Sequence, residues 1–588
     1  MANRDIISNL LHPEVHPQRN GFDLSHRKIL TAKAGELLPV LCEDCVPGDF
    51  FEMNASTLLR TFPLNTAAFM RAKLCFDFFF VPKTAIWSRY NDFISQRVDL
   101  RSSYVRGSAF EPNVTIDFLR TCVTTAAAPN SGSYSPIDSA DCRTKILQLL
   151  GYGYIGGNNR VDWPSANAQK SLTALPIAGY NFIYNNYYRN PWRDQPNSNQ
   201  IADANLDSVQ CTTYATSLVD NVVDYDFVQM HYHQWYKDLF VGSLPNQQFG
   251  NISSVSVSVD PAAVQLNTPS VFTTNSSDLY GKKNSVDNLV VSQGSSGTGT
   301  SLITSSQAGT FDVLALRRAM ALQKWKEYNM RAGYRNRAQQ KAQYGEGMPL
   351  DISHELQFID SFESDVMIDE VISTANTSSP SSGNGNLAEI AGKGIGFNRG
   401  HNIKFDVKVP GYIYCIAYVL PQADYDAVGF DKSLVRSEPF DHYLPAFQNI
   451  AMQPIQVQQI NAQFGTSAII SNSVIGYAPN WYEYKSRVDK CYGAFMDYLI
   501  VDTTPSAGSP SPQKQAGSLA PWCLHRPDIL NANLPYINTE AFYVNPRCLD
   551  HVFVSAADGY KETDQFMLNI NFDVKAVRPM SVLGLPTI

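Results

Sequence analysis

Charged residues are scarce in this chain of 588 residues, where Asp, Glu, Lys and Arg make up 17% of the sequence. Globular domains usually carry about 25%, so a coiled coil or helical bundle built on Glu, Lys and Arg is disfavoured. The 46 Lys and Arg against 54 Asp and Glu leave a net charge of −8. The chain therefore lacks the basic excess of a dedicated nucleic-acid-binding protein, although one basic face is compatible with this balance.

Long apolar runs are missing as well. No window holds the roughly 18 apolar residues that span a bilayer, so we expect no membrane insertion. Residues 1–15 lack a cationic start followed by an apolar segment, so we expect no signal peptide. The ten cysteines are scattered along a large chain without an export signal, which predicts mostly reduced thiols.

Catalytic and cofactor motifs are also absent from the sequence. Cys42 and Cys45 form a lone CxxC without a second ligand pair, and the imidazoles of His231 and His233 have no third strong ligand, which favours a packed or surface pair. The glycine-rich segment 392–396 lacks the spacing of a phosphate-binding loop. Segment 424–429 has too few carboxylates for an EF-hand, and the sequence leaves open an incidental cation there. We predict no enzyme, no catalytic residue, no metal site and no cofactor.

What the sequence does contain favours β structure. Hydrophobic residues make up 44% and aromatics 12%, with a polar surface supplied by Ser, Thr, Asn, Gln and Gly. Strict alternation of apolar and polar residues in three distant segments, 70–80, 401–409 and 565–577, predicts strands with one buried side. A sheet that joins them has high contact order, as in a sandwich or jelly roll. Further strands are predicted at 29–41, 251–259, 412–420, 467–475, 494–501 and 541–554.

Helices are predicted to be few. Segment 312–332 is rich in helix formers, with Asp312 as the N-cap and Gly333 as the stop, and smaller helices are predicted at 84–96 and 224–240. Long polar stretches interrupt the strands and do not separate self-sufficient patterns. We therefore predict a single domain over 1–588, with loop or insertion regions at approximately 100–250, 261–306, 373–396 and 503–520.

A basic stretch begins within the predicted long helix and continues beyond it. Between 317 and 341 it carries eight cations and one acid, with aromatic residues interleaved: Arg317, Arg318, Lys324, Lys326, Arg331, Arg335, Arg337 and Lys341, with Glu327, Trp325, Tyr328 and Tyr334. Cations can neutralise phosphates, and aromatic rings can stack on unpaired bases. A solvated helix face, or one docked on a partner subunit, explains the same pattern, and the sequence leaves both explanations open.

Ordered sequence blocks along nearly the whole chain carry a family resemblance. They comprise RNGFDLS at 19–25, TAKAGELLP at 31–39, RTFPL at 60–64, FFVP at 79–82, PIAGYN at 176–181, DHYLP at 441–445, YAPNWYEYK at 477–485, RPM at 578–580 and GLP at 584–586. In these blocks the chain resembles the major capsid proteins of the Microviridae, small tailless phages, and within them the gokushovirus-like or Bacteroidetes-associated branch.

The resemblance implies an eight-stranded antiparallel jelly roll of the viral capsid type, with long loop insertions and a few helices. It further implies a T=1 icosahedral shell of one capsid subunit type around circular single-stranded DNA, located in the virion and assembled in the host bacterial cytoplasm. Expected partners are copies of the chain, the packaged DNA, a minor pilot-type virion protein and a bacterial host receptor. The outward loop 261–306 is the candidate for receptor contact, and a disordered insertion explains the same composition equally well.

Seven cations are our candidates for the DNA-facing side of the shell: Arg19, Arg27, Lys28, Arg331, Arg335, Arg337 and Lys341. A net charge of −8 cannot neutralise a genome, so we also expect a small basic DNA-binding protein. The alternative hypothesis is a secreted β-sandwich protein that binds glycans, such as an adhesin, in which abundant Tyr, Trp and Asn would contact sugars. An enzyme such as a glycosidase ranks third.

Overall fold

The computed structural model describes residues 18–95, 113–124, 140–155, 171–192, 227–250, 272–301, 313–345, 354–372, 390–462, 474–496, 523–524, 542–549 and 564–582, with short gaps inside several of these ranges. The chain divides into two compact units, of which the first comprises Met1–Pro245 with Pro349–Ile588 and the second Asn246–Met348. No helix in the described part is long and apolar enough to cross a membrane. A single-domain organisation stays a prediction.

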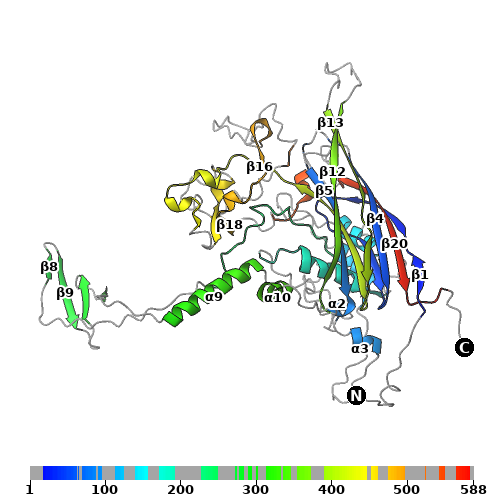
Figure 1. Ribbon diagram of the computed structural model, residues 1–588, viewed down its shortest axis with the longest axis horizontal. Coiled ribbons are helices and arrows are strands. Elements are labelled where there is room, and N and C mark those ends of the chain that lie inside the picture. The colour runs from blue at the N-terminus through cyan, green and yellow to red at the C-terminus, as the bar shows by residue number, and fades with distance from the viewer. Residues whose placement is uncertain are drawn as a thin grey trace, which may run out of the picture. The chain divides into compact units, whose positions relative to one another are not determined.

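The first unit contains a curled antiparallel sheet that has the strand order of a jelly roll (Figure 1). One half pairs in the order β2-β20-β4-β14, and the other in the order β3-β15-β5-β12. The eight strands are β2 (His26–Ala32), β3 (Leu38–Cys45), β4 (Phe50–Thr61), β5 (Arg71–Pro82), β12 (Gln357–Ile372), β14 (Ile403–Asp406), β15 (Gly411–Gln422) and β20 (Phe566–Arg578). The predicted eight-stranded antiparallel jelly roll is confirmed.

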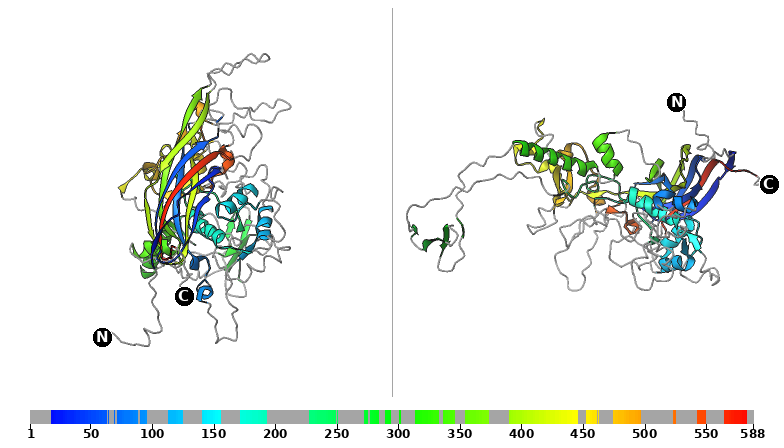
Figure 2. Two further views of the ribbon diagram at one scale, coloured as in Figure 1. Left: turned by 90° about the vertical axis from the view of Figure 1, so that its right-hand side faces the viewer. Right: turned by 90° about the horizontal axis from the view of Figure 1, so that it is seen from below.

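The two halves of the sheet face each other across one hydrophobic core. Phe80 of β5 and Phe405 of β14 come from different halves, and their ring centroids lie 5.3 Å apart. The hairpin of β12 and β13 (Ile390–Arg399) joins the halves at one side, because β13 also pairs with β4. The short strand β1 (Asn20–Asp23) extends the outer edge along β20. Figure 2 shows β20 in red between the blue strands β2 and β4.

Strand β20 confirms the alternation predicted at 565–577. Every second side chain from Phe566 to Ala576 is buried, and those between them are exposed or half-buried. The prediction at 401–409 is confirmed over a shorter span, since β14 covers only Ile403–Asp406. In β5 the inward face is as predicted, but the opposite face is also buried from Cys75 onward. An insertion therefore covers the outer side of β5, whereas solvent reaches the outer side of β20.

Two long insertions interrupt the jelly roll, at 83–356 between β5 and β12 and at 423–565 between β15 and β20. The first contains a helix whose nine residues are all buried, α7 (Leu175–Ile183), which contacts β5 and β15. This cover explains why β15 is buried along nearly its whole length. Its other elements in the first unit are α2 (Lys83–Ile86), α3 (Tyr90–Ser95), β6 (Asn113–Thr115), α4 (Ile116–Thr124), α5 (Ala140–Leu149), β7 (Ser171–Thr173) and the π-helix η1 (Tyr184–Tyr188).

A second, smaller core lies mainly in the second insertion, where it includes Tyr425, Ile455 and Tyr482, and Phe240 of the first insertion joins it. Four short strands frame it: β16 (Tyr425–Asp426), β17 (Met452–Gln456), β18 (Val474–Pro479) and β19 (Lys490–Cys491). The second unit holds a four-stranded sheet and two helices: β8 (Phe272–Thr274), β9 (Ser277–Lys283), β10 (Leu289–Gln293), β11 (Thr300–Ser301), α9 (Val313–Ala332) and α10 (Asn336–Tyr344). Helix α9 confirms the helix predicted at 312–332.

Several predicted elements differ from the structure. The strand at 29–41 is two strands, β2 and β3, and the helix at 84–96 is the two short helices α2 and α3. The prediction of a helix at 224–240 is wrong. The described residues 227–240 are mostly irregular and make isolated β-bridges to Glu36 and Tyr543. The described parts of 494–501 and 541–554 contain 3₁₀ turns rather than strands. The strand at 251–259 and most of that at 467–475 lie outside the described residues.

Candidate assembly and nucleic-acid surfaces

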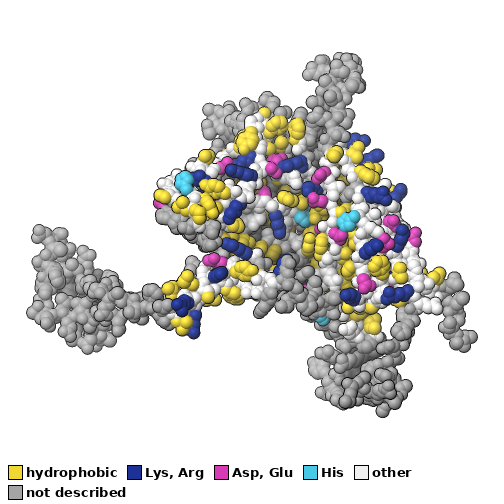
Figure 3. Space-filling view, in the orientation of Figure 1, with side chains coloured by type: hydrophobic (Ala, Val, Ile, Leu, Met, Phe, Trp, Pro, Cys, Tyr) yellow, Lys and Arg dark blue, Asp and Glu magenta, His cyan; other side chains and the backbone are white. Residues whose placement is uncertain are grey.

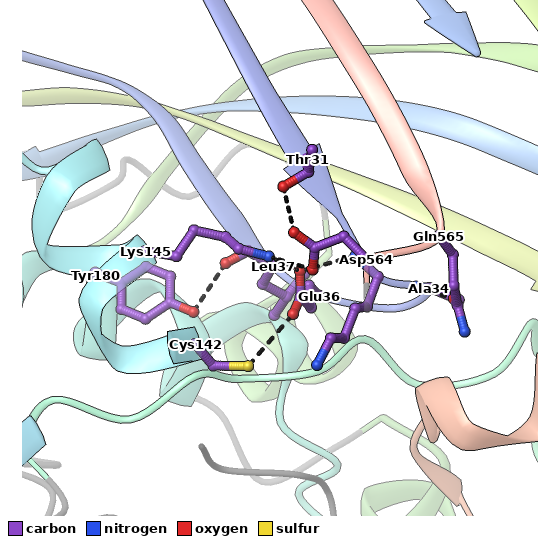
Figure 4. A network of polar contacts seen from close by, with 10 residues as sticks. Thr31, Ala34, Glu36, Leu37, Cys142, Lys145, Tyr180, Asp564 and Gln565 are labelled. Atoms are coloured by element: carbon purple, nitrogen blue, oxygen red, sulfur yellow. Dashed lines mark hydrogen bonds and ion pairs between the residues drawn. The ribbon is translucent and has the colours of Figure 1, made fainter. Parts of the chain in front are cut away.

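A buried polar junction joins the jelly roll to its first insertion (Figure 4). Glu36 has no exposed surface, and its carboxylate accepts hydrogen bonds from the Lys33 backbone N–H at 2.9 Å and from Lys145 Nζ at 3.0 Å. The Cys142 thiol donates to the other carboxylate oxygen at 3.6 Å. Because Cys142 and Lys145 lie on α5 and Glu36 lies between β2 and β3, these bonds fix α5 against the sheet.

The start of β20 completes this junction. Lys145 Nζ also lies 3.0 Å from Asp564 Oδ1, and the Thr31 hydroxyl donates to the second oxygen of Asp564. Gln565 accepts a hydrogen bond from the Ala34 backbone N–H at 3.0 Å. Two carboxylates thus share one ammonium group, and the resulting network joins three parts of the chain that are 109 and 419 residues apart in sequence. This arrangement holds the sheet and its first insertion together.

The histidines of the HYH segment form the packed pair that the sequence favoured. His231 stacks on Tyr184 with ring centroids 3.8 Å apart and donates from Nε2 to Asn181 Oδ1 at 3.0 Å. His233 stacks on Tyr418 with centroids 4.4 Å apart. Burial lowers the pKa of His231 to about 3 and that of His233 to about 4. Both imidazoles are therefore neutral core residues at physiological pH.

Asp77 is a buried carboxyl that the sequence placed on an exposed face. Tyr188 of η1 donates a hydrogen bond to Asp77 Oδ2 at 2.7 Å, and Tyr418 contributes a second bond. Burial raises the pKa of Asp77 to about 6, although the two tyrosine bonds act in the opposite direction. The alternation in β5 misled the sequence interpretation, because η1 covers the face on which solvent was expected.

The structure separates two of the predicted DNA-facing cations, Arg27 and Lys28. They are consecutive in β2, so their side chains leave opposite faces of the strand. Arg27 is exposed on the outer face beside Ile29. Lys28 is half-buried, and burial lowers its pKa, opposed by the nearby Cys42 and Glu43. One shared DNA-facing surface cannot include both side chains in this strand.

Arg19 lies in a cluster of charges within the chain. A methyl group at Gly48 would come within 3.3 Å of Arg19 Nη2, which places this guanidinium beside the Val46–Asp49 turn. Asp49 is fully buried and lies 3.7 Å from Arg578 Nε. Burial raises the pKa of Asp49, and the charges of Arg578 and Arg19 oppose that shift. Arg19 is exposed beside this turn, and its DNA-facing role stays a prediction.

The remaining candidates belong to the second unit. Arg331 is exposed in the last turn of α9, and Lys341 is exposed on α10. Arg337 lies on α10, while Arg335 lies outside the described residues. The structure thus places Arg331, Arg337 and Lys341 on two consecutive helices, and α9 adds exposed Arg317, Arg318 and Lys324. A DNA-facing role for these residues stays a prediction.

Large apolar side chains are exposed on several strands and on α9. On the sheet, Ile29, Met367 and Phe397 are 68%, 71% and 73% exposed. On α9 the exposed apolar or aromatic residues are Leu314, Leu316, Met320, Leu322, Trp325 and Tyr328. Figure 3 shows yellow hydrophobic side chains among the dark blue Lys and Arg side chains. Exposed apolar patches of this kind are typical of protein–protein contacts, which favours the docked-helix explanation for α9.

Comparisons with known proteins show what this arrangement resembles. The family model described as capsid protein (F protein) matches residues 12–588. Capsid protein VP1 of Chlamydia phage 1 is 22% identical over 638 aligned residues, which cover 98% of this chain and 96% of the relative. Capsid protein VP1 of Bdellovibrio phage phiMH2K is 24% identical over 511 residues, which cover 82% of this chain and 83% of the relative.

Proposed function

The chain belongs to the phage capsid protein (F protein) family, and on this basis we propose that its copies form a T=1 icosahedral shell around a circular single-stranded DNA genome. It is a structural capsid protein of a small phage and not an enzyme, and it is located in the virion. Family membership replaces the alternative of a secreted glycan-binding adhesin, and the confirmed jelly roll is a fold that viral capsids use.

The exposed apolar side chains carry the proposal for how the subunits meet. Met367 and Phe397 lie on β12 and β13, in the hairpin that joins the halves of the sheet, and both are more than two-thirds exposed. A separate subunit would leave these side chains in water, whereas contacts between symmetry-related copies bury them. Many modest contacts of this kind add up over a closed shell, so no single one needs to be strong.

Assembly can be tested with the full-length chain and a double variant, M367S with F397S. We expect wild-type chains to sediment as uniform shells and the variant to stay as free subunits with an unchanged urea unfolding midpoint. Asn571→Ser, which replaces an exposed polar residue of β20, is the matched control and should assemble normally. Normal shells from the double variant would refute this surface as an interface.

For the genome contact we propose the basic stretch of α9 and α10. Its cations are close together in sequence, and three that the structure describes, Arg317, Arg318 and Arg331, are exposed. Since the whole chain has a net charge of −8, a small basic protein supplies the larger share of phosphate neutralisation. A pilot-type minor protein, a host receptor that contacts outward loops, and assembly in the bacterial cytoplasm belong to the same proposal. The free thiols of the described cysteines agree with a reducing compartment.

The DNA contact is tested by neutralising Arg331, Arg335 and Arg337 together with glutamine. We expect shells of normal size that contain less DNA, measured by the ratio of nucleic-acid to protein absorbance in purified particles. A matched triple variant neutralises Lys432, Lys485 and Arg487 in the second insertion, and its particles should keep their DNA. Full genomes in the first triple variant would refute this assignment.

A further inference from the structure

Three side chains of metal-ligand type converge at the base of the second insertion. A carboxylate oxygen of Asp424 and the sulfur atoms of Cys491 and Cys523 all lie within 4.8 Å of one another. Both cysteines are 7% exposed, and the Asp424 side chain is 16% exposed. The three residues are far apart in sequence, so the cluster exists only in the folded chain.

The backbone holds these three positions in place. The Asp424 N–H donates to the Leu524 carbonyl at 2.8 Å, next to Cys523. Strands β16 and β19 pair in parallel and place Asp426 opposite Cys491, and the Ala427 N–H donates to the Cys491 carbonyl at 3.2 Å. Each ligand atom is therefore attached to a segment that hydrogen bonds fix to its neighbour.

The two thiols contact each other as free cysteines. Cys491 and Cys523 are within hydrogen-bond reach of one another and form no disulfide. Burial raises the pKa of both thiols, and the charges of Asp424 and Asp426 raise them further. A bound divalent cation would favour the thiolate form of both cysteines, because it stabilises thiolates directly and offsets the negative charge of the surrounding carboxylates.

We propose that Asp424, Cys491 and Cys523 bind a structural zinc ion, with Asp426 or a water molecule in the fourth position. Thiolate ligands select zinc over the hard cations Mg²⁺ and Ca²⁺, and zinc accepts a carboxylate in a four-coordinate site. Segment 424–429, for which the sequence left open an incidental cation, supplies the carboxylate. The sequence did not reveal the site, because the two cysteines lie in separate segments without a recognised spacing.

The neighbouring charges are compatible with a cation. Arg71 lies 3.4 Å from Asp424 and 2.8 Å from Asp489. If Asp424 binds the metal, Arg71 can still form its shorter ion pair with Asp489. Lys490 is paired with Asp431 at 2.6 Å. In the part of the chain that the structure describes, Arg71 is paired with Asp424 and Asp489, and Asp426 adds a third carboxylate nearby.

A cross-link at this position would stabilise the second insertion. The second insertion has only a small hydrophobic core, and small cores commonly depend on a metal or a disulfide. A zinc ion that holds 424, 491 and 523 closes two long loops at once and lowers the entropy of the unfolded chain. In a reducing compartment zinc provides this cross-link without oxidation of the thiols.

The full-length, unassembled chain provides the test. After dialysis against Zn²⁺ and then metal-free buffer, mass spectrometry of metals should give about one zinc ion per chain. Replacement by Co²⁺ should produce the thiolate-to-cobalt charge-transfer band. Cys491→Ser and Cys523→Ser should each lose the band and at least nine-tenths of the bound zinc. Cys75→Ser is the matched control, since Cys75 is also 7% exposed, and should keep both.

Three results would overturn the proposal. The first is wild-type protein without stoichiometric zinc and without the cobalt band. The second is a disulfide between Cys491 and Cys523 in protein purified with the thiols blocked at lysis. The third is zinc retained by both serine variants. If the serine variants do not fold, the cobalt band and the thiol state of the wild-type chain still decide, because neither depends on a variant.

Discussion

The ammonium group of Lys145 lies 3.0 Å from the carboxylate of Glu36 and 3.0 Å from that of Asp564. Glu36 has no exposed surface, and the Lys145 side chain is 16% exposed. Burial alone would lower the pKa of Lys145, but the two carboxylates outweigh it and raise that pKa above its ordinary value. Lys145 is therefore charged in the folded chain, and its charge is what makes the burial of Glu36 tolerable.

Lys145→Met should be strongly destabilising, since it leaves the buried carboxylate of Glu36 without its cation. Breaking a buried pair by removing one partner costs about 3–5 kcal/mol. Urea unfolding of the purified full-length chain measures this loss. The double variant E36Q with K145M should lose less than Lys145→Met alone, because it removes the uncompensated charge.

The matched control for this pair is Lys73→Met, which breaks the ion pair with Glu363 at 2.8 Å. Glu363 is 61% exposed, and exposed pairs contribute about 0–1 kcal/mol. Equal losses for Lys73→Met and Lys145→Met would show that burial of the Glu36 pair has no energetic consequence.

Asp77→Asn should stabilise the chain at neutral pH. Burial raises the pKa of Asp77 from 3.8 to about 6. Between these values the unfolded chain releases a proton that the folded chain keeps, so stability falls as pH rises through this window. A shift of this size corresponds to about 3 kcal/mol, since each unit is about 1.4 kcal/mol. The asparagine side chain keeps an oxygen that can accept the hydrogen bond from Tyr188, but it carries no charge. Asp77→Asn should therefore lose this part of the pH dependence of stability.

The measurement is the free energy of unfolding from pH 4 to pH 7.5 in both chains. Asp406→Asn removes an exposed carboxylate from β14 and controls for the loss of one negative charge. The same change in stability between pH 4 and pH 6 in the wild-type chain and in both variants would contradict the role of Asp77.

His231→Phe should reduce acid sensitivity. The unfolded chain takes up a proton on this imidazole below about pH 6.5, whereas the folded chain does so only near pH 3, because burial lowers the pKa. Stability therefore falls as pH drops from about 6.5 toward 3, by about 1.4 kcal/mol per pH unit for this group. Phenylalanine retains the stacking on Tyr184 but does not titrate, so the slope of unfolding free energy against pH should become shallower.

The control for this variant is His401→Phe, because His401 is 54% exposed and lies at the surface beside Asp360. The same reduction of slope in both variants would argue that loss of any histidine has this effect. A slope unchanged in His231→Phe would contradict a buried neutral imidazole at this position.

Sequence alternation predicted those strands whose outer face meets solvent. Strand β20 alternates in sequence and in burial, because only its inner face packs. The sequence did not predict helix α7, because the segment LPIAGYNFI is mostly apolar and lacks polar residues repeating with the 3.6-residue period of a helix. The same helix buries the outer face of β15, whose continuous apolar run is typical of a strand covered on both sides.

The polar interior could not be derived from spacing. Glu36, Lys145 and Asp564 meet only after the first insertion has folded back on the sheet, and no motif relates their positions. The sequence did reveal the basic stretch, because its cations lie close together along the chain, on two consecutive helices. Sequence reasoning therefore located a local cluster of charge, and tertiary packing determined the long-range ones.

The turn between β2 and β3 also depends on packing against a distant part of the chain. The variant Gly35→Ala tests this packing. Gly35 has φ of +77°, and a Cβ there would lie 2.5 Å from Val544 Cβ. Its N–H donates to the Val419 carbonyl at 2.8 Å, and its carbonyl accepts from the His233 N–H at 2.8 Å. Alanine adds both backbone strain and a clash with the Val544 side chain, so we expect a loss of about 3 kcal/mol in urea unfolding.

Gly151→Ala separates the two causes. Gly151 has φ of +95°, but nothing lies within 4 Å of the added Cβ, so only the left-handed backbone is penalised. Its loss should be about 1–2 kcal/mol. The difference between the two variants then measures the close approach of Val544 to the turn that directs the chain from one half of the jelly roll into the other. Equal losses would mean that φ alone requires glycine at 35, and that Val544 has room to move away.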